Sequence, residues 1–161
     1  MSQCVVEQLQ QQWGGAILET HNFRGDDTVV VRRDRILEIC HWLKSTPALA
    51  FDLMMDLCGV DYPERAERFE VVYHLYSTTK KHRVRLKVRV PNDDCQVASI
   101  VTVWRAANWF EREAFDLFGI RFTGHPELKR LLMFEEFEGH PLRKDYPVNR
   151  RPKIPTPESL M

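Results

Sequence analysis

The chain has 161 residues, enough for one domain with a buried core, and its apolar and charged fractions of 43% and 29% are ordinary for a globular protein. Its 23 lysines and arginines balance 23 aspartates and glutamates, and this zero net charge argues against general nucleic-acid binding. The sequence has neither the run of about 20 apolar residues that a transmembrane helix needs nor the basic start and apolar run of a signal peptide, so we expect a cytosolic protein.

The N-terminal third predicts two helices around a pair of strands. Apolar residues recur at helical spacing over 6–13, and two glycines end this helix. An extended pattern over 16–21 and a β-branched one over 28–31 predict two strands joined by a turn. Asp34 is expected to cap a second helix, whose apolar stripe over 36–43 ends before a proline.

The clearest β pattern lies in the middle of the chain. Residues 69–76 alternate apolar and polar, and after a short turn residues 83–90 alternate apolar and basic, which predicts a hairpin with one apolar face. The short apolar stretch over 51–60 favours another strand. A serine at position 99 could cap a short helix over 99–104.

The basic strand of this hairpin leaves three interpretations open. The stretch 77–90 contains no acid and six basic residues, namely Lys80, Lys81, Arg83, Arg85, Lys87 and Arg89. Its polar face could be solvated, could meet an acidic protein partner, or could bind nucleic acid. Tyr73 and Tyr76 lack the layout of an aromatic stacking platform, so nucleic acid is the least favoured of the three.

The segment 108–132 stands out by its density of aromatic and charged residues. Asn108 is expected to be the N-cap of a helix, with Glu111 completing a capping box and Gly119 ending the helix. Arg112 and Asp116 are four residues apart and are expected to pair. A helix of this kind is expected to lie between its own sheet and another body.

Glycines and prolines beyond residue 132 exclude a long helix or a central strand. Residues 140–161 carry five basic and two acidic residues, a charge of 5 − 2 = +3, and interspersed apolar side chains. Wrapping of a partner and disorder are both compatible with this pattern. The sequence thus predicts a single α+β domain over 1–139, with a mixed or antiparallel sheet and flanking helices, followed by an extended proline-rich docking arm over 140–161.

Two sets of residues are candidates for chemistry. Glu111, Glu113 and Asp116 could act as acid/base pairs or metal ligands, but their expected capping and pairing favours structural roles. His125 and His140 each lie in a Gly-His-Pro sequence, yet zinc needs three or four ligands and no further cluster accompanies them.

The four cysteines are widely scattered and form no C-x-x-C pair, which favours reduced thiols over a metal or iron–sulfur site. Phosphate-binding loops and the common hydrolase motifs are also missing from the sequence. The residues alone therefore favour a non-catalytic subunit with a central helix and a docking arm.

Two longer motifs resemble a known family. Glu111-Arg112-Glu113, Asp116-Leu117-Phe118, His125 and the following Lys129-x-Leu131-Leu132 are similar to the pattern of the C subunit, or 30-kilodalton subunit family, of proton-pumping NADH:quinone oxidoreductase, respiratory complex I. The sequence Gly-His-Pro-Leu-Arg-Lys-Asp-Tyr-Pro over 139–147 resembles the C-terminal motif of that family.

The resemblance implies a structural subunit of the peripheral arm, on the cytoplasmic face of the cell inner membrane and without direct membrane insertion. Such a subunit binds no cofactor or metal itself and has no catalytic residue, while the complex uses FMN, iron–sulfur clusters, NADH and quinone. Its partners would be chiefly the large D subunit, which helps form the quinone site, and also the B and I subunits, with no nucleic acid.

Carried onto this chain, the resemblance makes a set of residues candidates for the subunit interface: Glu111, Arg112, Glu113, Asp116, His125, Arg130, His140, Pro141, Leu142, Arg143, Lys144, Asp145, Tyr146 and Pro147. Three alternatives remain. The first is the equivalent subunit of a membrane-bound hydrogenase or plastid-type complex, the second is an RNA-binding module that uses the basic hairpin, and the third is a metal-dependent hydrolase using His125, His140 and Glu113.

Overall fold

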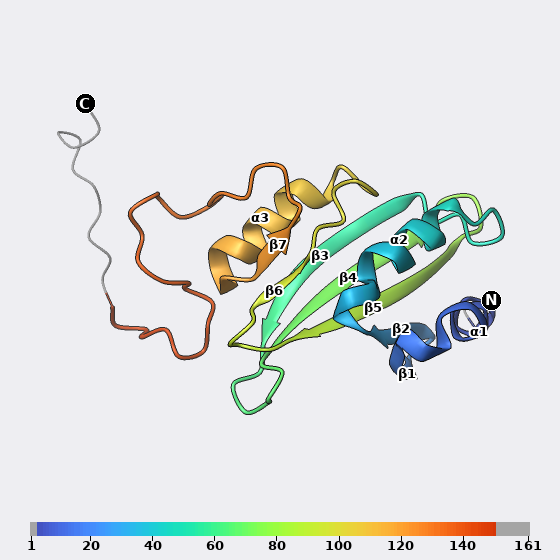
Figure 1. Cartoon of the computed structure of the whole chain (residues 1–161), viewed down its shortest axis with the longest axis horizontal. Coiled ribbons are helices and arrows are strands. Elements are labelled where there is room, and N and C mark those ends of the chain that lie inside the picture. Colours follow the sequence, from blue (N-terminus) through green and yellow to red (C-terminus); the bar gives the residue numbers. More distant parts are fainter. Residues whose placement is uncertain (1–2, 151–161) are drawn as a thin grey trace.

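A five-stranded mixed sheet forms the centre of the fold in the computed structural model, which describes residues 3–150 (Figure 1). The strand order is β1-β2-β5-β4-β3, in which β2 and β5 are parallel and the other neighbours antiparallel. The α+β prediction and the predicted strands are confirmed. The strands are β1 (Ile17–Phe23), β2 (Asp26–Val31), β3 (Leu53–Asp61), β4 (Phe69–Ser77) and β5 (His82–Val90).

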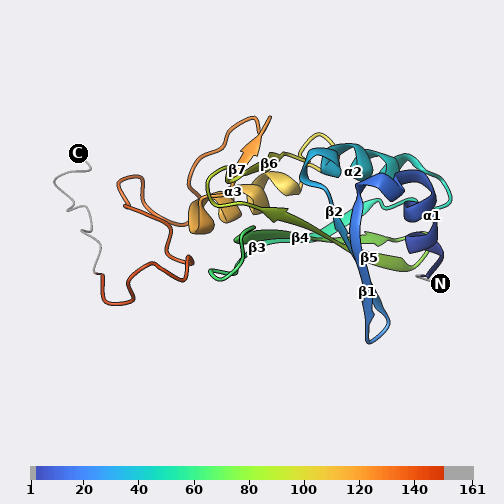
Figure 2. The same cartoon turned by 60° about the horizontal axis from the view of Figure 1, so that its bottom comes forward.

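Three helices accompany the sheet, and α2 and α3 lie on the same side of it (Figure 2). The β1–β2 hairpin projects away from the opposite side, which no helix of residues 3–150 covers (Figure 2). The helices are α1 (Gln3–Trp13), α2 (Ile36–Ser45) and α3 (Ala107–Phe118), and the short 3₁₀ turns η1 (Gly14–Ala16) and η2 (Arg33–Arg35) precede β1 and α2. None of these helices is long and apolar enough to cross a membrane.

The core lies between the helices and one face of the sheet. Alternate residues of β4 and β5 point into it, as the period of two predicts, and Phe69, Tyr73 and Leu86 are fully buried. Ile36 and Leu43 of α2 cover them from the other layer. This arrangement leaves the charged alternate residues of β4 and β5 on the face without helices.

Two predicted local features are wrong. Asp34 makes no capping bond to α2, because η2 occupies the helix start and the Asp34 carboxylate instead pairs with Arg32 at 2.8 Å. Residues 99–104 form only a hydrogen-bonded turn, in which the Trp104 amide donates to Ile100 O at 3.0 Å. The Trp104 indole is buried and donates to Phe51 O at 3.2 Å, which holds the turn against the core.

A second sheet has two strands, one before and one after α3 in the sequence. Its parallel strands are β6 (Gln96–Ala98) and β7 (Arg121–Thr123), and the sequence did not predict either of them. Each has only three residues, too few to produce a recognisable alternation.

Helix α3 runs beside β3 at very short range. A Cβ atom added to Gly59 would lie 2.7 Å from the Phe118 ring, so only glycine allows this approach. At its end, Gly119 has φ +76°, and its amide donates to Phe115 O at 2.8 Å. Gly119 is therefore the predicted left-handed residue that ends the helix.

We expect Gly59→Ala to lower the free energy of unfolding by about 1–3 kcal/mol, because the new methyl group must displace Phe118 or α3. Urea unfolding followed by circular dichroism measures this. Gly15→Ala is the control, since a Cβ there meets nothing within 4 Å. Equal stability of the two variants would show that α3 does not depend on this contact.

Candidate functional site

The segment that follows α3 is held by one buried carboxylate. Asp116 Oδ2 accepts the amides of Leu131, Leu132 and Met133 at 3.0, 2.7 and 2.8 Å, and Oδ1 accepts from Arg130 Nη1 at 2.7 Å. Burial works to raise the pKa of Asp116, but these four donors outweigh burial and hold the pKa below its usual value. The ionised carboxylate thus fixes the loop 130–133 on the helix.

The predicted pair between Arg112 and Asp116 is wrong. The Arg112 guanidinium instead donates to two main-chain carbonyls, through Nε to Lys129 O at 3.2 Å and through Nη2 to Arg130 O at 3.0 Å. The two side chains are one helical turn apart and bind the same loop. Asp116 accepts from main-chain amides of the loop, and Arg112 donates to its main-chain carbonyls. A direct pair would leave both sets of main-chain groups without these partners.

Arg130 extends the same network towards the C-terminus. Besides its ion pair with Asp116, its Nη2 donates to Phe137 O at 2.8 Å and to Gly139 O at 3.2 Å. One guanidinium therefore joins α3 to residues 137–139, just before the second Gly-His-Pro sequence.

The capping role predicted for Asn108 and Glu111 is also wrong. Helix α3 begins at Ala107 without a side-chain cap, because a turn over 104–108 already leads into it. Glu111 faces the core, is fully buried, and accepts from Ser99 Oγ at 2.6 Å and from Ile100 N at 2.8 Å. It ties α3 to the turn before it.

Burial raises the pKa of Glu111 to about 7, against the two hydrogen bonds, which act to lower it. Its neighbours Cys40 and Tyr73 are buried as well, and for both of them burial is the main cause that raises the pKa, with the charge of Glu111 adding to it. This cluster is enclosed in the core and offers no access to a substrate.

The two histidines bind separate main-chain groups. His125 donates through Nε2 to Asn108 O at 3.2 Å and accepts from Glu127 N through Nδ1 at 3.0 Å. His140 donates through Nδ1 to Asp116 O at 2.9 Å, and burial lowers its pKa. Among the described residues no group of three or more His, Cys, Asp or Glu side chains could hold a metal ion.

The start of the predicted arm covers the C-terminal end of α3. Leu142 N donates to Leu117 O at 3.1 Å, and Arg143 Nε donates to Phe118 O at 2.6 Å. These carbonyls have no partner within the helix, and a cation suits this end of the helix dipole. A Cβ on Gly119 would lie 2.6 Å from His140 and Arg143, so this glycine also makes room for the arm.

A second anchor holds the arm to the end of β3. Asp61 is buried and pairs with Arg68 at 2.8 Å, and its Oδ2 accepts from Lys144 N at 2.7 Å. Arg68 also pairs with Asp145 at 2.9 Å. Arg68 holds the pKa of Asp61 below its usual range. The roles of Asp61 and Arg68 could not be predicted from the sequence, because no local spacing connects them with residues 144–145.

The ring of Tyr146 stacks on that of Phe137, with 5.9 Å between the ring centroids. Residues 140–147 therefore lie against their own domain. Of the predicted arm over 140–161, residues 151–161 lie outside the described residues.

Three large apolar side chains are exposed on the outward surface of this region, among charged residues. Trp109, Leu132 and Leu142 are 65%, 58% and 49% exposed, and Arg112 lies over the Trp109 ring at 5.6 Å. Glu113 is exposed beside them. An aromatic and an arginine among exposed leucines are typical of protein interfaces, and the buried charges beneath keep them in place.

Comparison with known proteins places these motifs in a family. The model of the 30 kDa subunit of respiratory-chain NADH dehydrogenase matches residues 29–152. The C subunit of NADH-quinone oxidoreductase from Roseiflexus sp. is 51% identical over 89% of this chain and 83% of its own. The corresponding protein of Geobacter sulfurreducens is 46% identical over 89% and 88%.

Two solved structures share the fold. The trypsin-resistant fragment (1–134) of Nqo5 is 34% identical, covers 78% of this chain and 98% of its own, and has a TM-score of 0.66. A chain of the membrane-bound sulfane sulfur reductase, an archaeal respiratory membrane complex, is 25% identical, covers 92% and 86%, and has a TM-score of 0.78.

We expect Asp116→Asn to lower the free energy of unfolding by about 2–4 kcal/mol, because Arg130 and three amides lose an ionised acceptor. Chemical denaturation measures the loss. Glu113→Gln, on the exposed side of the same helix, should change stability by less than about 0.5 kcal/mol. An Asp116 variant as stable as this control would contradict the role of the carboxylate.

The raised pKa of Glu111 predicts a pH dependence of stability. The folded state binds this proton more tightly than the unfolded state, so the contribution is complete below pH about 4.5 and is lost as the pH rises through about 7. Between pH 5 and pH 8 we expect the free energy of unfolding of Glu111→Gln to rise by roughly 1–3 kcal/mol relative to that of the wild type. Chemical denaturation of both proteins at several pH values measures this. A difference in unfolding free energy between them that stayed constant across the range would contradict the raised pKa.

Proposed function

The chain belongs to the 30 kDa subunit family of respiratory-chain NADH dehydrogenase, and from this membership we infer that it is the C subunit in the peripheral arm of complex I. Its partners are then other subunits of the complex, and the complex as a whole is an oxidoreductase. We propose that this chain contributes structure and no catalytic group to the transfer of electrons from NADH to quinone.

The main support for a structural role is what the charged motif residues bind. Asp116, Arg112, Arg130, His125 and His140 bind main-chain groups of their own chain, in addition to the ion pair between Asp116 and Arg130. These bonds engage both carboxylate oxygens of Asp116 and both ring nitrogens of His125, which are groups that could otherwise ligate a metal or transfer a proton. We propose that they shape the surface formed by Trp109, Leu132 and Leu142, which we call the α3 surface.

The α3 surface would pack against the large D subunit, which helps form the quinone site, with the B and I subunits nearby. Glu111 and Asp116 are buried, so they would organise this interface from beneath. Arg112, Glu113 and the run 140–147 would border it. We propose that the chain itself holds no FMN, iron–sulfur cluster, NADH or quinone, and that it lies peripherally at the cytoplasmic face of the inner membrane.

The equivalent subunit of another respiratory membrane complex is a second candidate, supported by the likeness to a chain of the sulfane sulfur reductase over 92% of this chain. Mass spectrometry of the proteins that co-purify with a tagged chain separates the two. Recovery of flavin- and NADH-binding subunits identifies complex I, whereas recovery of other membrane-complex subunits without them identifies the other assembly.

We expect Trp109→Ser and Leu132→Ser to reduce co-purification of the largest partner by about tenfold, because both side chains lose burial at the interface. Leu18→Ser is the matched control, since this leucine is 53% exposed on the distant β1. Wild-type recovery with both variants, or equal loss with the control, would contradict an interface on the α3 surface.

A further inference from the structure

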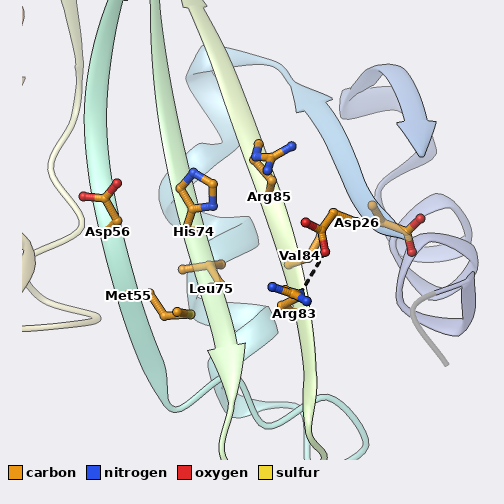
Figure 3. A pocket seen from close by; sticks show the side chains of 9 residues that line it. Asp26, Met55, Asp56, His74, Leu75, Arg83, Val84 and Arg85 are labelled. Atoms are coloured by element: carbon orange, nitrogen blue, oxygen red, sulfur yellow. Dashed lines mark ion pairs between the residues drawn. The ribbon is translucent and has the colours of Figure 1, made fainter. Parts of the chain in front are cut away.

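The face of the sheet without helices contains a groove of about 340 Å³ (Figure 3). One wall is the start of β2 in the projecting hairpin, and the floor is formed by β3, β4 and β5. Its charged and polar lining is formed by Asp26, Asp27, Asp56, His74, Arg83 and Arg85, and Met55 is one of the apolar side chains that border it.

Strand register puts Arg85 near the middle of this groove. Asp56 pairs with His74, His74 with Arg85, and Arg85 with Thr28, which makes one row across four neighbouring strands. Strands lie about 4.8 Å apart, so His74 separates Arg85 from Asp56. Figure 3 shows these three side chains in sequence across the floor.

The other basic side chains on this face of β5 already have carboxylate partners. Arg83 pairs with Asp26 at 2.8 Å, Lys87 with the buried Glu70 at 2.8 Å, and Arg89 with Glu19. These pairs make the face far less basic than the sequence suggests.

Arg85 differs from these three. Its Nη1 donates to the Thr28 hydroxyl at 3.1 Å, and no carboxylate of the described residues lies within 4.0 Å of the guanidinium. The side chain is half-buried. A guanidinium can bind a carboxylate through two parallel hydrogen bonds, and most of its donors remain available for one.

We propose that this groove, which we call the Arg85 groove, receives an aspartate or glutamate side chain of a neighbouring protein, whose carboxylate binds Arg85. This inference rests on the proposed function, because it requires the chain to be assembled with protein partners. The groove lies on the helix-free face of the sheet, whereas the α3 surface includes a helix packed on the other face, so the two would serve separate contacts.

The rim favours a protein over the other anionic ligands. Asp26 is already paired with Arg83, whereas Asp56 has no ion pair among the described residues, so the rim would disfavour the successive phosphates of a nucleic acid more strongly than one carboxylate that reaches Arg85 directly. Met55 is 53% exposed at the same rim and offers apolar contact to the body of a protein. A single carboxylate on an otherwise neutral protein surface fits both features.

The experiment uses the tagged full chain expressed in cells that assemble the complex. A photo-crosslinking amino acid replaces Met55, and mass spectrometry identifies the cross-linked peptide. In parallel, Arg85→Glu and Arg85→Gln are compared with Arg105→Glu, which makes the same charge change at an exposed arginine away from the groove. Circular dichroism melting of each full chain confirms that the variants fold.

We expect a cross-link to one partner protein at a segment that contains an aspartate or glutamate. Arg85→Glu should reduce that cross-link by about tenfold or more and Arg85→Gln by less, while Arg105→Glu leaves it unchanged. Replacing the partner's carboxylate by lysine should restore the cross-link to Arg85→Glu, which a merely structural role of Arg85 would not produce.

Several results would overturn the inference: no cross-link in the assembled complex, a cross-link to RNA, a cross-link to a segment without a carboxylate, or equal cross-linking by the folded Arg85 and Arg105 variants. Binding of inorganic phosphate to the groove with no protein cross-link would overturn it as well. In each case recovery of complex I subunits with the tagged wild-type chain leaves the proposed function intact, whereas its absence contradicts the proposed function itself.

Discussion

The buried carboxylate of Asp116 is the interaction on which the C-terminal third of this protein depends. It binds three consecutive amides and one guanidinium, and Arg130 then carries the connection from the helix to the carbonyls of residues 137 and 139. Residues 130–139 contain no helix or strand. Their conformation is therefore maintained largely by hydrogen bonds to side chains, and they lead into the run 140–147, which has its own contacts with the end of α3 and with Asp61.

This organisation gives the charged and the apolar residues of the motif opposite roles. Glu111 and Asp116 are buried and bind main-chain amides, where an unpaired polar atom would be costly. Trp109 and Leu132 point outwards, where they cost little in an isolated chain and gain from burial in an assembly. In the structural role that we propose, buried charges of this kind would hold exposed apolar side chains in place for contact with a partner.

The helix-free face of the sheet follows a different principle. Its basic strand is largely balanced by carboxylates from the neighbouring β4 and from β1 and β2, which lie far from it in the sequence. Charge counted along one strand overstates the field that a partner meets, because neighbouring strands in a sheet contribute side chains to the same face. Arg85 differs from the other arginines and the lysine on this face of β5, because the partner of its guanidinium within the described chain is the hydroxyl of Thr28 and not a carboxylate.

Periodic patterns in the sequence were sufficient to predict β1 to β5, the three helices and the glycine that ends α3, because each of these depends on residues close together in the chain. The motifs were likewise sufficient to indicate the family. The partners of Glu111, Arg112 and Asp116 were not predictable from spacing: local rules offer each a neighbour on its own helix, but tertiary packing presented better ones. These partners are main-chain groups 11 to 18 residues away in the sequence. The fold fixes them beside the charged side chains, whereas an exposed side chain one turn away must be ordered before it can pair. Only the folded chain therefore determines which main-chain groups lie within reach.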